Sequence, residues 1–84
     1  MNSKHRKTLE SIFSDPVHAN VRWSDIEALP ASLGAGISDG RGSRVNIKLN
    51  GQRAVFHRPH PQPDTDKGAL KAVRRFLREA EIKL

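Results

Sequence analysis

The dipeptide Asn50-Gly51 constrains the fold of this chain more than any other feature of the sequence. It lies between residues 44–49 and 52–57, two runs in which apolar and polar side chains alternate. Asn and Gly accept the positive φ angles that a type I′ turn requires at both central positions, so the pattern predicts a two-residue β-hairpin. With this turn Leu49 pairs with Gln52, and the register of the whole hairpin follows.

The predicted register gives the hairpin one apolar face and one basic face. Successive side chains of a strand point to opposite sides, so a shift of one residue would exchange the two faces. One face carries Val45, Ile47, Leu49, Ala54 and Phe56. The other face pairs Arg44 with His57, Asn46 with Val55, and Lys48 with Arg53. We therefore expect the first face to enter a core and the second to meet solvent and carry the function.

Two helices are predicted before the hairpin. Residues 8–13 have helical spacing of apolar side chains, and this helix ends near Asp15-Pro16 because the residue before proline avoids the α region. Ser24 and Glu27 have the spacing of a capping box, which predicts a second helix running toward Leu33. Residues 35–39, between that helix and the hairpin, give a weak indication of an additional edge strand.

One helix is predicted after the hairpin. Residues 58–63 hold three prolines and predict a loop, because proline has no amide donor for a strand or helix. Thr65 or Asp66 then caps a last helix, whose apolar stripe consists of Ala69, Leu70, Val73, Phe76, Leu77 and Ala80. Trp23, Phe56 and Phe76 are expected in the core. The predicted fold is therefore α+β, with a three-stranded antiparallel sheet flanked by helices in the order α-α-β-β-β-α and one sheet face open.

The composition fits one small domain that is stabilised by packing alone. The chain has 84 residues and no cysteine, so it forms neither a disulfide nor a thiolate metal site. No run approaches the ~20 apolar residues of a membrane span, and the N-terminus lacks the apolar segment of a signal peptide. We therefore expect a soluble, cytoplasmic protein with no membrane partner.

The positive charge lies in the second part of the chain. The formal net charge is +6, and residues 1–34 hold four basic and four acidic residues, so the excess comes from residues 35–84. Between Arg41 and Pro63 there are five basic residues and no acidic one. Such a distribution suits phosphate binding, because counterion release drives association with nucleic acid. It is also compatible with a solvated basic surface or with an acidic protein partner.

From about Trp23 to Ile82 the chain resembles the HicA family of toxin–antitoxin toxins. The resemblance rests on four segments in order: Ser24-Asp25-Ile26-Glu27, Gly40-Arg41-Gly42-Ser43, Phe56-His57-Arg58-Pro59-His60-Pro61, and Lys67-Gly68-Ala69-Leu70 with the helix that follows. It implies a fold like the double-stranded-RNA-binding domain, mRNA cleavage, and neutralisation by an acidic HicB-like antitoxin. It also implies a catalytic histidine directly after Gly-Ser, where this chain has Arg44.

The hairpin register offers a substitute for that histidine. RNA carries its own nucleophile, the 2′-hydroxyl, so cleavage needs a proton acceptor, a proton donor and cations around the phosphate. His57 lies opposite Arg44 in the predicted register, and His60 could join them from the loop. We expect no metal site and no cofactor, because His57 and His60 lack a third nearby ligand. The catalytic candidates are therefore His57, Arg44 and His60.

The candidates for RNA contact are cations of the hairpin and the last helix. They are Arg41, Arg44, Lys48, Arg53, Arg58, Lys67 and Lys71. The helix lysines are equally explained as ordinary surface charges, whereas five hairpin cations without a carboxylate favour binding.

Three interpretations of function follow. The leading one is a metal-independent endoribonuclease that acts on mRNA. The alternative is a module of the same fold that binds RNA or the antitoxin without cleavage. A small DNA-binding protein is the weakest, because the chain shows no helix-turn-helix pair. We divide the chain into an N-terminal helical extension, residues 1–22, and a HicA-like domain, residues 23–84.

Overall fold

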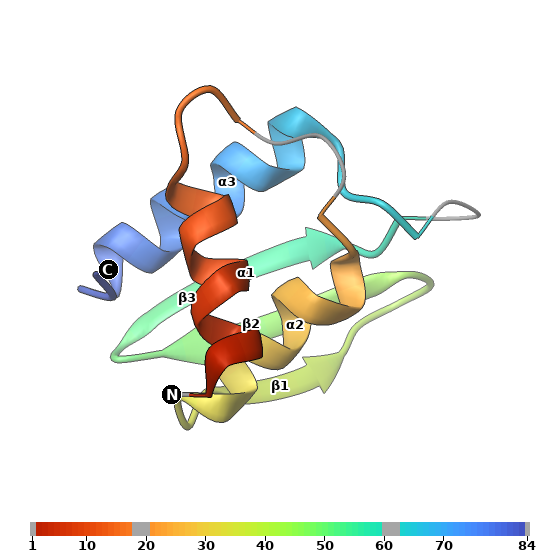
Figure 1. Ribbon diagram of the computed structural model, residues 1–84. Helices are drawn as coiled ribbons and strands as arrows, with labels where there is room; N and C mark the ends of the chain where they lie inside the picture. Colours follow the sequence, from red (N-terminus) through yellow and green to blue (C-terminus); the bar gives the residue numbers. More distant parts are fainter. Residues whose placement is uncertain (1, 18–20, 60–62, 84) are drawn as a thin grey trace.

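The computed structural model describes residues 2–17, 21–59 and 63–83, which fold into two layers. The elements in chain order are α1 (Ser3–Phe13), α2 (Trp23–Ser32), β1 (Gly36–Asp39), β2 (Arg44–Leu49), β3 (Gln52–His57) and α3 (Lys67–Glu79). Figure 1 shows the three helices on one side of the sheet, with the other side uncovered. The predicted α+β class and the order α-α-β-β-β-α are confirmed.

The sheet has the strand order β1-β2-β3, and both strand pairs are antiparallel. The hairpin register is confirmed at every predicted pair from Leu49 with Gln52 to Arg44 with His57. Asn50 has a φ of 49° and Gly51 a φ of 81°, which are the positive angles that a type I′ turn requires. The turn chemistry therefore determined the register, and the register determined which side chains reach the core.

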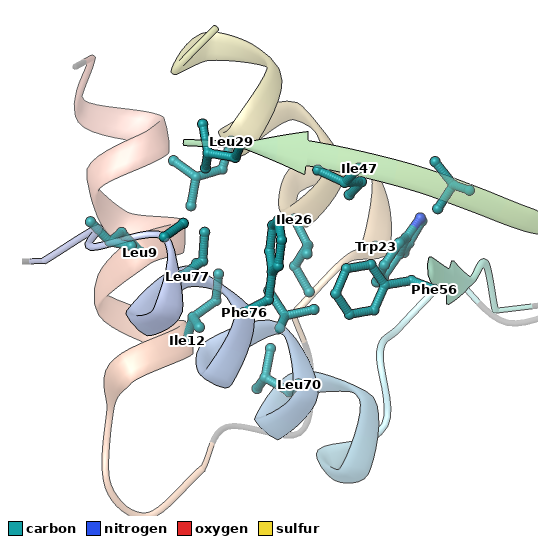
Figure 2. Close-up of a cluster of buried hydrophobic side chains, with 14 residues drawn as sticks. Leu9, Ile12, Trp23, Ile26, Leu29, Ile47, Phe56, Leu70, Phe76 and Leu77 are labelled. Atoms are coloured by element: carbon teal, nitrogen blue, oxygen red, sulfur yellow. The ribbon is translucent and has the colours of Figure 1, made fainter. Parts of the chain in front are cut away.

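The core lies between the helices and the apolar face of the hairpin. Trp23, Phe56 and Phe76 form a row of aromatic contacts, with ring centroids 5.9 Å and 5.8 Å apart (Figure 2). Tilted and edge-on arrangements at such distances are favourable for aromatic rings. The prediction that these three side chains belong to the core is confirmed. The sheet is thereby fixed with its basic face toward solvent.

Helix α1 belongs to the same core as the rest of the molecule. Its side chains Leu9 and Ile12 are buried, with at most 3% of their surface exposed. Arg74 of α3 donates hydrogen bonds of 2.7 Å to the backbone oxygens of Ile12 and Ser14. A cation there satisfies carbonyl groups at the C-terminal end of α1, which have no partner within the helix. The N-terminal helix is thus packed and hydrogen-bonded as part of the domain.

Two helix starts differ from the sequence-based expectation. Helix α1 begins at Ser3 rather than at residue 8, because the side chain of Asn2 accepts a hydrogen bond of 2.8 Å from the amide of His5. The capping box predicted for α2 is wrong. That helix begins at Trp23, its N-cap is Arg22, and no side chain caps it. At α3 the predicted cap is confirmed, since Asp66 accepts from the amide of Ala69 at 2.7 Å.

None of the helices in the described parts of the chain has the length and apolar character that a membrane crossing requires.

Candidate nucleic-acid interface

The uncovered side of the sheet, called the open face below, carries the polar and basic half of the hairpin. Strand alternation directs every second side chain to this side, while its neighbours enter the core. The open face consists of Gly36 and Ser38 of β1, Arg44, Asn46 and Lys48 of β2, and Arg53, Val55 and His57 of β3. The arrangement provides three cations and a histidine without a carboxylate among these eight residues.

One end of the open face holds the pair Arg44 and His57. The two residues are cross-strand partners, and Nε of Arg44 donates a long hydrogen bond of 3.4 Å to Nε2 of His57. That contact places Nε2 of the imidazole beside the guanidinium. Both side chains are exposed to solvent. A phosphate at this end could meet a fixed positive charge and a proton acceptor together.

Gly40 shapes the surroundings of Arg44. A Cβ atom at Gly40 would lie 3.0 Å from Cβ of Arg44 and 3.5 Å from Nδ2 of Asn46. The amide of Gly40 also donates to the carbonyl of Arg44 at 2.9 Å, so the backbone after β1 passes close over the start of β2. The first glycine of the segment Gly40-Arg41-Gly42-Ser43 therefore leaves room for Arg44, because a side chain at position 40 would press on it.

The other end of the open face holds Lys48 opposite Arg53. Like charges directly opposite each other destabilise a sheet, so this pair is unfavourable for folding alone. Lys48 comes four positions after Arg44 on β2, which corresponds to roughly 13 Å along an extended strand. Among the described residues, no carboxylate forms an ion pair with Arg44, Lys48 or Arg53. Their charges are available to an anionic ligand.

A hollow of about 490 Å³ extends from the centre of the open face to its Lys48–Arg53 end. Its lining includes Gly36, Ser38, Asn46 and Val55 on the open face, together with Lys48 and Arg53. Val55 is 58% exposed and is the one large hydrophobic side chain that the described residues leave open to solvent. The centre of the face is thus shallow and partly apolar, while both ends are cationic.

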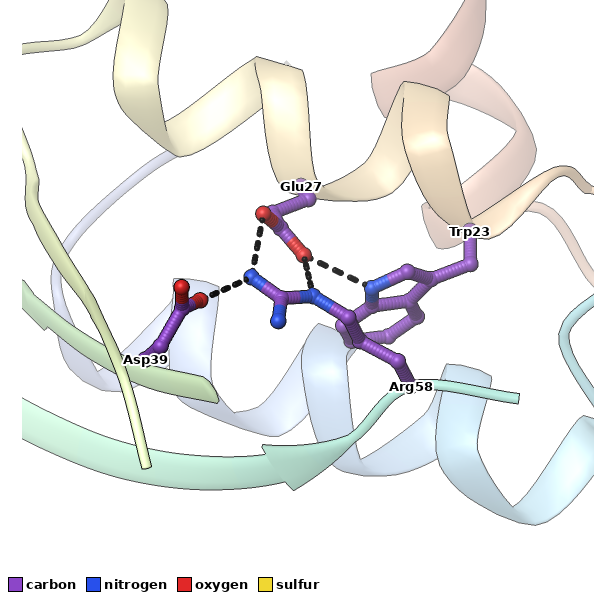
Figure 3. A network of polar contacts seen from close by, with 4 residues as sticks. All are labelled: Trp23, Glu27, Asp39 and Arg58. Carbon is purple, nitrogen blue, oxygen red and sulfur yellow. Dashed lines mark hydrogen bonds and ion pairs between the residues drawn. The ribbon is translucent and has the colours of Figure 1, made fainter. Parts of the chain in front are cut away.

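Arg58 lies on the helix side of the sheet, away from the open face. It comes two residues after the buried Phe56 and therefore points to the same side. Its Nε and Nη2 donate to the two carboxylate oxygens of Glu27 at 2.9 Å and 3.0 Å, and Nη2 also lies 2.8 Å from Asp39. Figure 3 shows this guanidinium between the two carboxylates, with the Trp23 indole beside it. The structure does not bring Arg58 together with the other hairpin cations.

Glu27 is the centre of this polar cluster. Its carboxylate also accepts a hydrogen bond of 2.9 Å from Nε1 of Trp23. The hydrogen bonds from Arg58 lower the pKa of the Glu27 carboxyl, against the opposing effect of burial. The same contacts with Glu27 and Asp39 raise the pKa of Arg58. Glu27, which was expected to cap α2, instead connects that helix through Arg58 to β1 and to the end of β3.

The remaining candidates lie apart from the open face or outside the described residues. Arg41 is exposed in the turn before β2. Lys67 and Lys71 are exposed on α3, on the side of the helix that faces away from its buried residues and from the sheet. His60 lies outside the described residues. Within the described ranges, no group of three His, Cys, Asp or Glu side chains is arranged to hold a metal ion.

Sequence reasoning passed over two residues of this surface. Asn46 carries no charge and matches no motif, and Gly40 entered only as part of the segment Gly40-Arg41-Gly42-Ser43, so a search for catalytic residue types selects neither. The predicted register already contained the relevant signal for Asn46, because it places this amide between the two cationic pairs.

A sheet covered by helices on one face, with the order α-α-β-β-β-α, defines an α+β domain like the double-stranded-RNA-binding domain. Comparison with protein families finds a match of residues 23–82 to the model of the HicA toxin of bacterial toxin–antitoxin systems. The match covers most of the chain, and the chain belongs to the HicA toxin family. Neither the curated proteins nor the solved structures gave a significant match.

Proposed function

We propose that this protein is an mRNA-cleaving toxin, a metal-independent endoribonuclease that binds RNA on the open face. The observation that carries the proposal is the contact between Arg44 and His57 on a basic surface. Membership of the HicA family supports a toxin and, with it, an RNA target. The resemblance implies a histidine at position 44, and this chain offers one on the neighbouring strand instead.

In the proposed reaction the RNA supplies its own nucleophile. As Arg44 turns its guanidinium from Nε2 of His57 to the phosphate, the 2′-oxygen bonds to the adjacent phosphorus, its proton passes to the freed Nε2, and the P–O5′ bond breaks. The departing 5′-oxygen takes up a proton, and the products are a 2′,3′-cyclic phosphate and a 5′-hydroxyl end. Arg44 stabilises the negative charge that develops on the phosphate oxygens. His60 is the candidate for the second proton transfer.

We also propose that an acidic HicB-like antitoxin holds the toxin inactive. The toxin carries a net charge of +6, and the open-face cations form no ion pairs among the described residues. An acidic partner that covers this surface would compete with RNA for the same charges. Purified antitoxin should therefore inhibit cleavage, and its inhibition should weaken as the salt concentration rises.

The second candidate function is binding without cleavage, and the arginine at position 44 favours it. His57→Ala separates the two. For an endoribonuclease, loss of this general base should lower the cleavage rate by a factor of roughly 10² to 10⁴, with RNA binding retained. His5→Ala, which changes a histidine of α1 on the helix side, serves as the matched control. Undiminished cleavage by His57→Ala would refute the mechanism, and absence of cleavage by the unmodified protein would favour the binding module.

A further inference from the structure

We propose that Asn46 and Val55 form a nucleobase subsite, which gives RNA cleavage a sequence preference at the nucleotide adjoining the scissile phosphate. The proposal rests on the function proposed above. It assigns a role to the centre of the open face, to which neither charge nor the family resemblance drew attention. The occupant is one unpaired base of a single-stranded RNA.

The position of the two residues is the first argument. Asn46 and Val55 are direct cross-strand partners, with the pair Arg44 and His57 on one side and the pair Lys48 and Arg53 on the other. An RNA strand whose phosphates meet both cationic ends must cross the centre of the face. The base of a nucleotide in between then lies against these two side chains.

The shape of the surface is the second argument. The hollow of about 490 Å³ includes both residues in its lining and lies within the range of roughly 300 to 1,000 Å³ that is typical of small-ligand sites. On β1 the neighbouring positions are Gly36, which has no side chain, and Ser38, which has a small one, so this space stays open. Val55, which is 58% exposed, offers the face of a base an apolar contact.

The chemistry of Asn46 is the third argument. A side-chain amide carries both donors and an acceptor, so it can form a paired set of hydrogen bonds with one base edge. Among the side-chain hydrogen bonds of the described residues none involves the Asn46 amide, which is exposed and can therefore meet a ligand. Its Nδ2 lies toward Gly40 and the stem of Arg44, since a Cβ built at Gly40 would be 3.5 Å away. A base bound there adjoins the phosphate at Arg44.

The same geometry selects single strands. In an RNA duplex the bases are stacked and their major-groove edges lie in a groove too deep and narrow for protein side chains, whereas unpaired bases expose their edges and faces. A hollow in a β-sheet surface accepts a splayed base and not a stacked pair. We therefore expect a duplex of the same sequence to escape cleavage.

The test compares single-stranded RNA oligonucleotides that differ only at the nucleotide next to the cleaved bond. Asn46→Asp and Asn46→Ser should change the ratio of kcat/KM between the best and the worst base by roughly tenfold or more, because paired amide–base contacts discriminate on that scale. Gln52→Glu introduces the same charge change as Asn46→Asp on the helix side of β3 and should keep the wild-type ratio. Val55→Thr keeps the side-chain shape but replaces a methyl group with a hydroxyl, so it weakens the apolar contact. We expect weaker binding of every base. Thermal unfolding verifies that each variant is folded.

Two results would overturn the proposal. One is a base preference that stays unchanged in both Asn46 variants, whether or not their overall cleavage changes. The other is that both substitutions weaken binding of the antitoxin but leave the RNA preference intact, which would assign the surface to a protein partner. If the unmodified protein does not cleave, the proposed function fails, but the subsite is still tested. Fluorescence anisotropy then gives the ratio of Kd values for the same oligonucleotides, and an unchanged ratio in the variants refutes the subsite.

Discussion

If the open face is the RNA-binding surface, removing two of its charges must change the salt dependence of binding by a calculable amount. Each phosphate that a protein neutralises on single-stranded RNA contributes about −0.7 to the slope of log K against log salt. Arg44, Lys48 and Arg53 together predict a slope of about −2. The double variant Lys48→Gln/Arg53→Gln should leave about −0.7. Between 50 mM and 200 mM salt, wild-type affinity should then fall by roughly 20-fold and that of the variant by roughly threefold.

A second double variant, Lys67→Gln/Lys71→Gln, makes the comparison decisive. It removes the same two positive charges from the outer side of α3, on the opposite side of the sheet. Any effect of net charge alone would be equal in the two proteins. The assay is fluorescence anisotropy of a labelled single-stranded RNA at four or more salt concentrations, with circular dichroism to verify that both variants fold.

The outcome distinguishes three arrangements. A slope that drops in the β-strand variant and persists in the α3 variant supports binding on the open face. Equal drops in both would show that RNA responds to the overall charge of the protein and does not bind at a defined surface. A drop in the α3 variant alone would move the interface to the helices, and the reasoning from the uncovered sheet would be refuted.

Three further outcomes follow from other contacts. Arg74→Gln should lower the free energy of unfolding by about 2 kcal/mol in urea denaturation, because two carbonyls at the end of α1 lose a charged donor. Arg75→Gln, at the adjacent exposed position, should change it little. Because the pKa of Glu27 is lowered in the folded protein, its carboxylate stabilises the fold above pH 4.5, and this stabilisation is lost as pH falls through the folded-state pKa. The difference in free energy of unfolding between wild type and Glu27→Gln should therefore shrink between pH 7 and pH 3. Gly40→Ala should lower kcat by roughly fivefold in a cleavage assay while the fold persists, because the new Cβ displaces Arg44.

The hairpin could be predicted from sequence because all of its determinants are local. The turn Asn50-Gly51 sets the register, strict alternation over residues 44–49 sets the faces of β2, and the register carries these faces over to β3. The contact between Arg44 and His57 follows directly from that register. Nothing distant in the chain had to be known, so both the hairpin and the pair Arg44 and His57 were accessible from sequence.

The cluster around Glu27 was not predictable in the same way. Glu27 and Arg58 are 31 positions apart, and their contact depends on how α2 packs across the sheet. Glu27 comes three residues after Ser24, which is the spacing of a capping box. Tertiary packing instead brings its carboxylate to the guanidinium of Arg58, which is a stronger hydrogen-bond partner than a backbone amide. Local patterns thus identified the helix correctly and misassigned the role of one of its side chains.

Charge counting along the chain overestimates the cations available to a ligand, and strand parity explains why. Arg53 and Arg58 are five residues apart in a segment without acidic residues, yet they lie on opposite sides of the sheet. The carboxylates that neutralise Arg58 come from α2 and β1, outside that segment. On β3, an odd number of steps from the buried Phe56 leads to the open face and an even number leads to the helices. Of the five cations between Arg41 and Pro63, Arg58 therefore helps to hold the fold together. The cations of the open face form no ion pair among the described residues, so an RNA phosphate or an acidic antitoxin would meet them there.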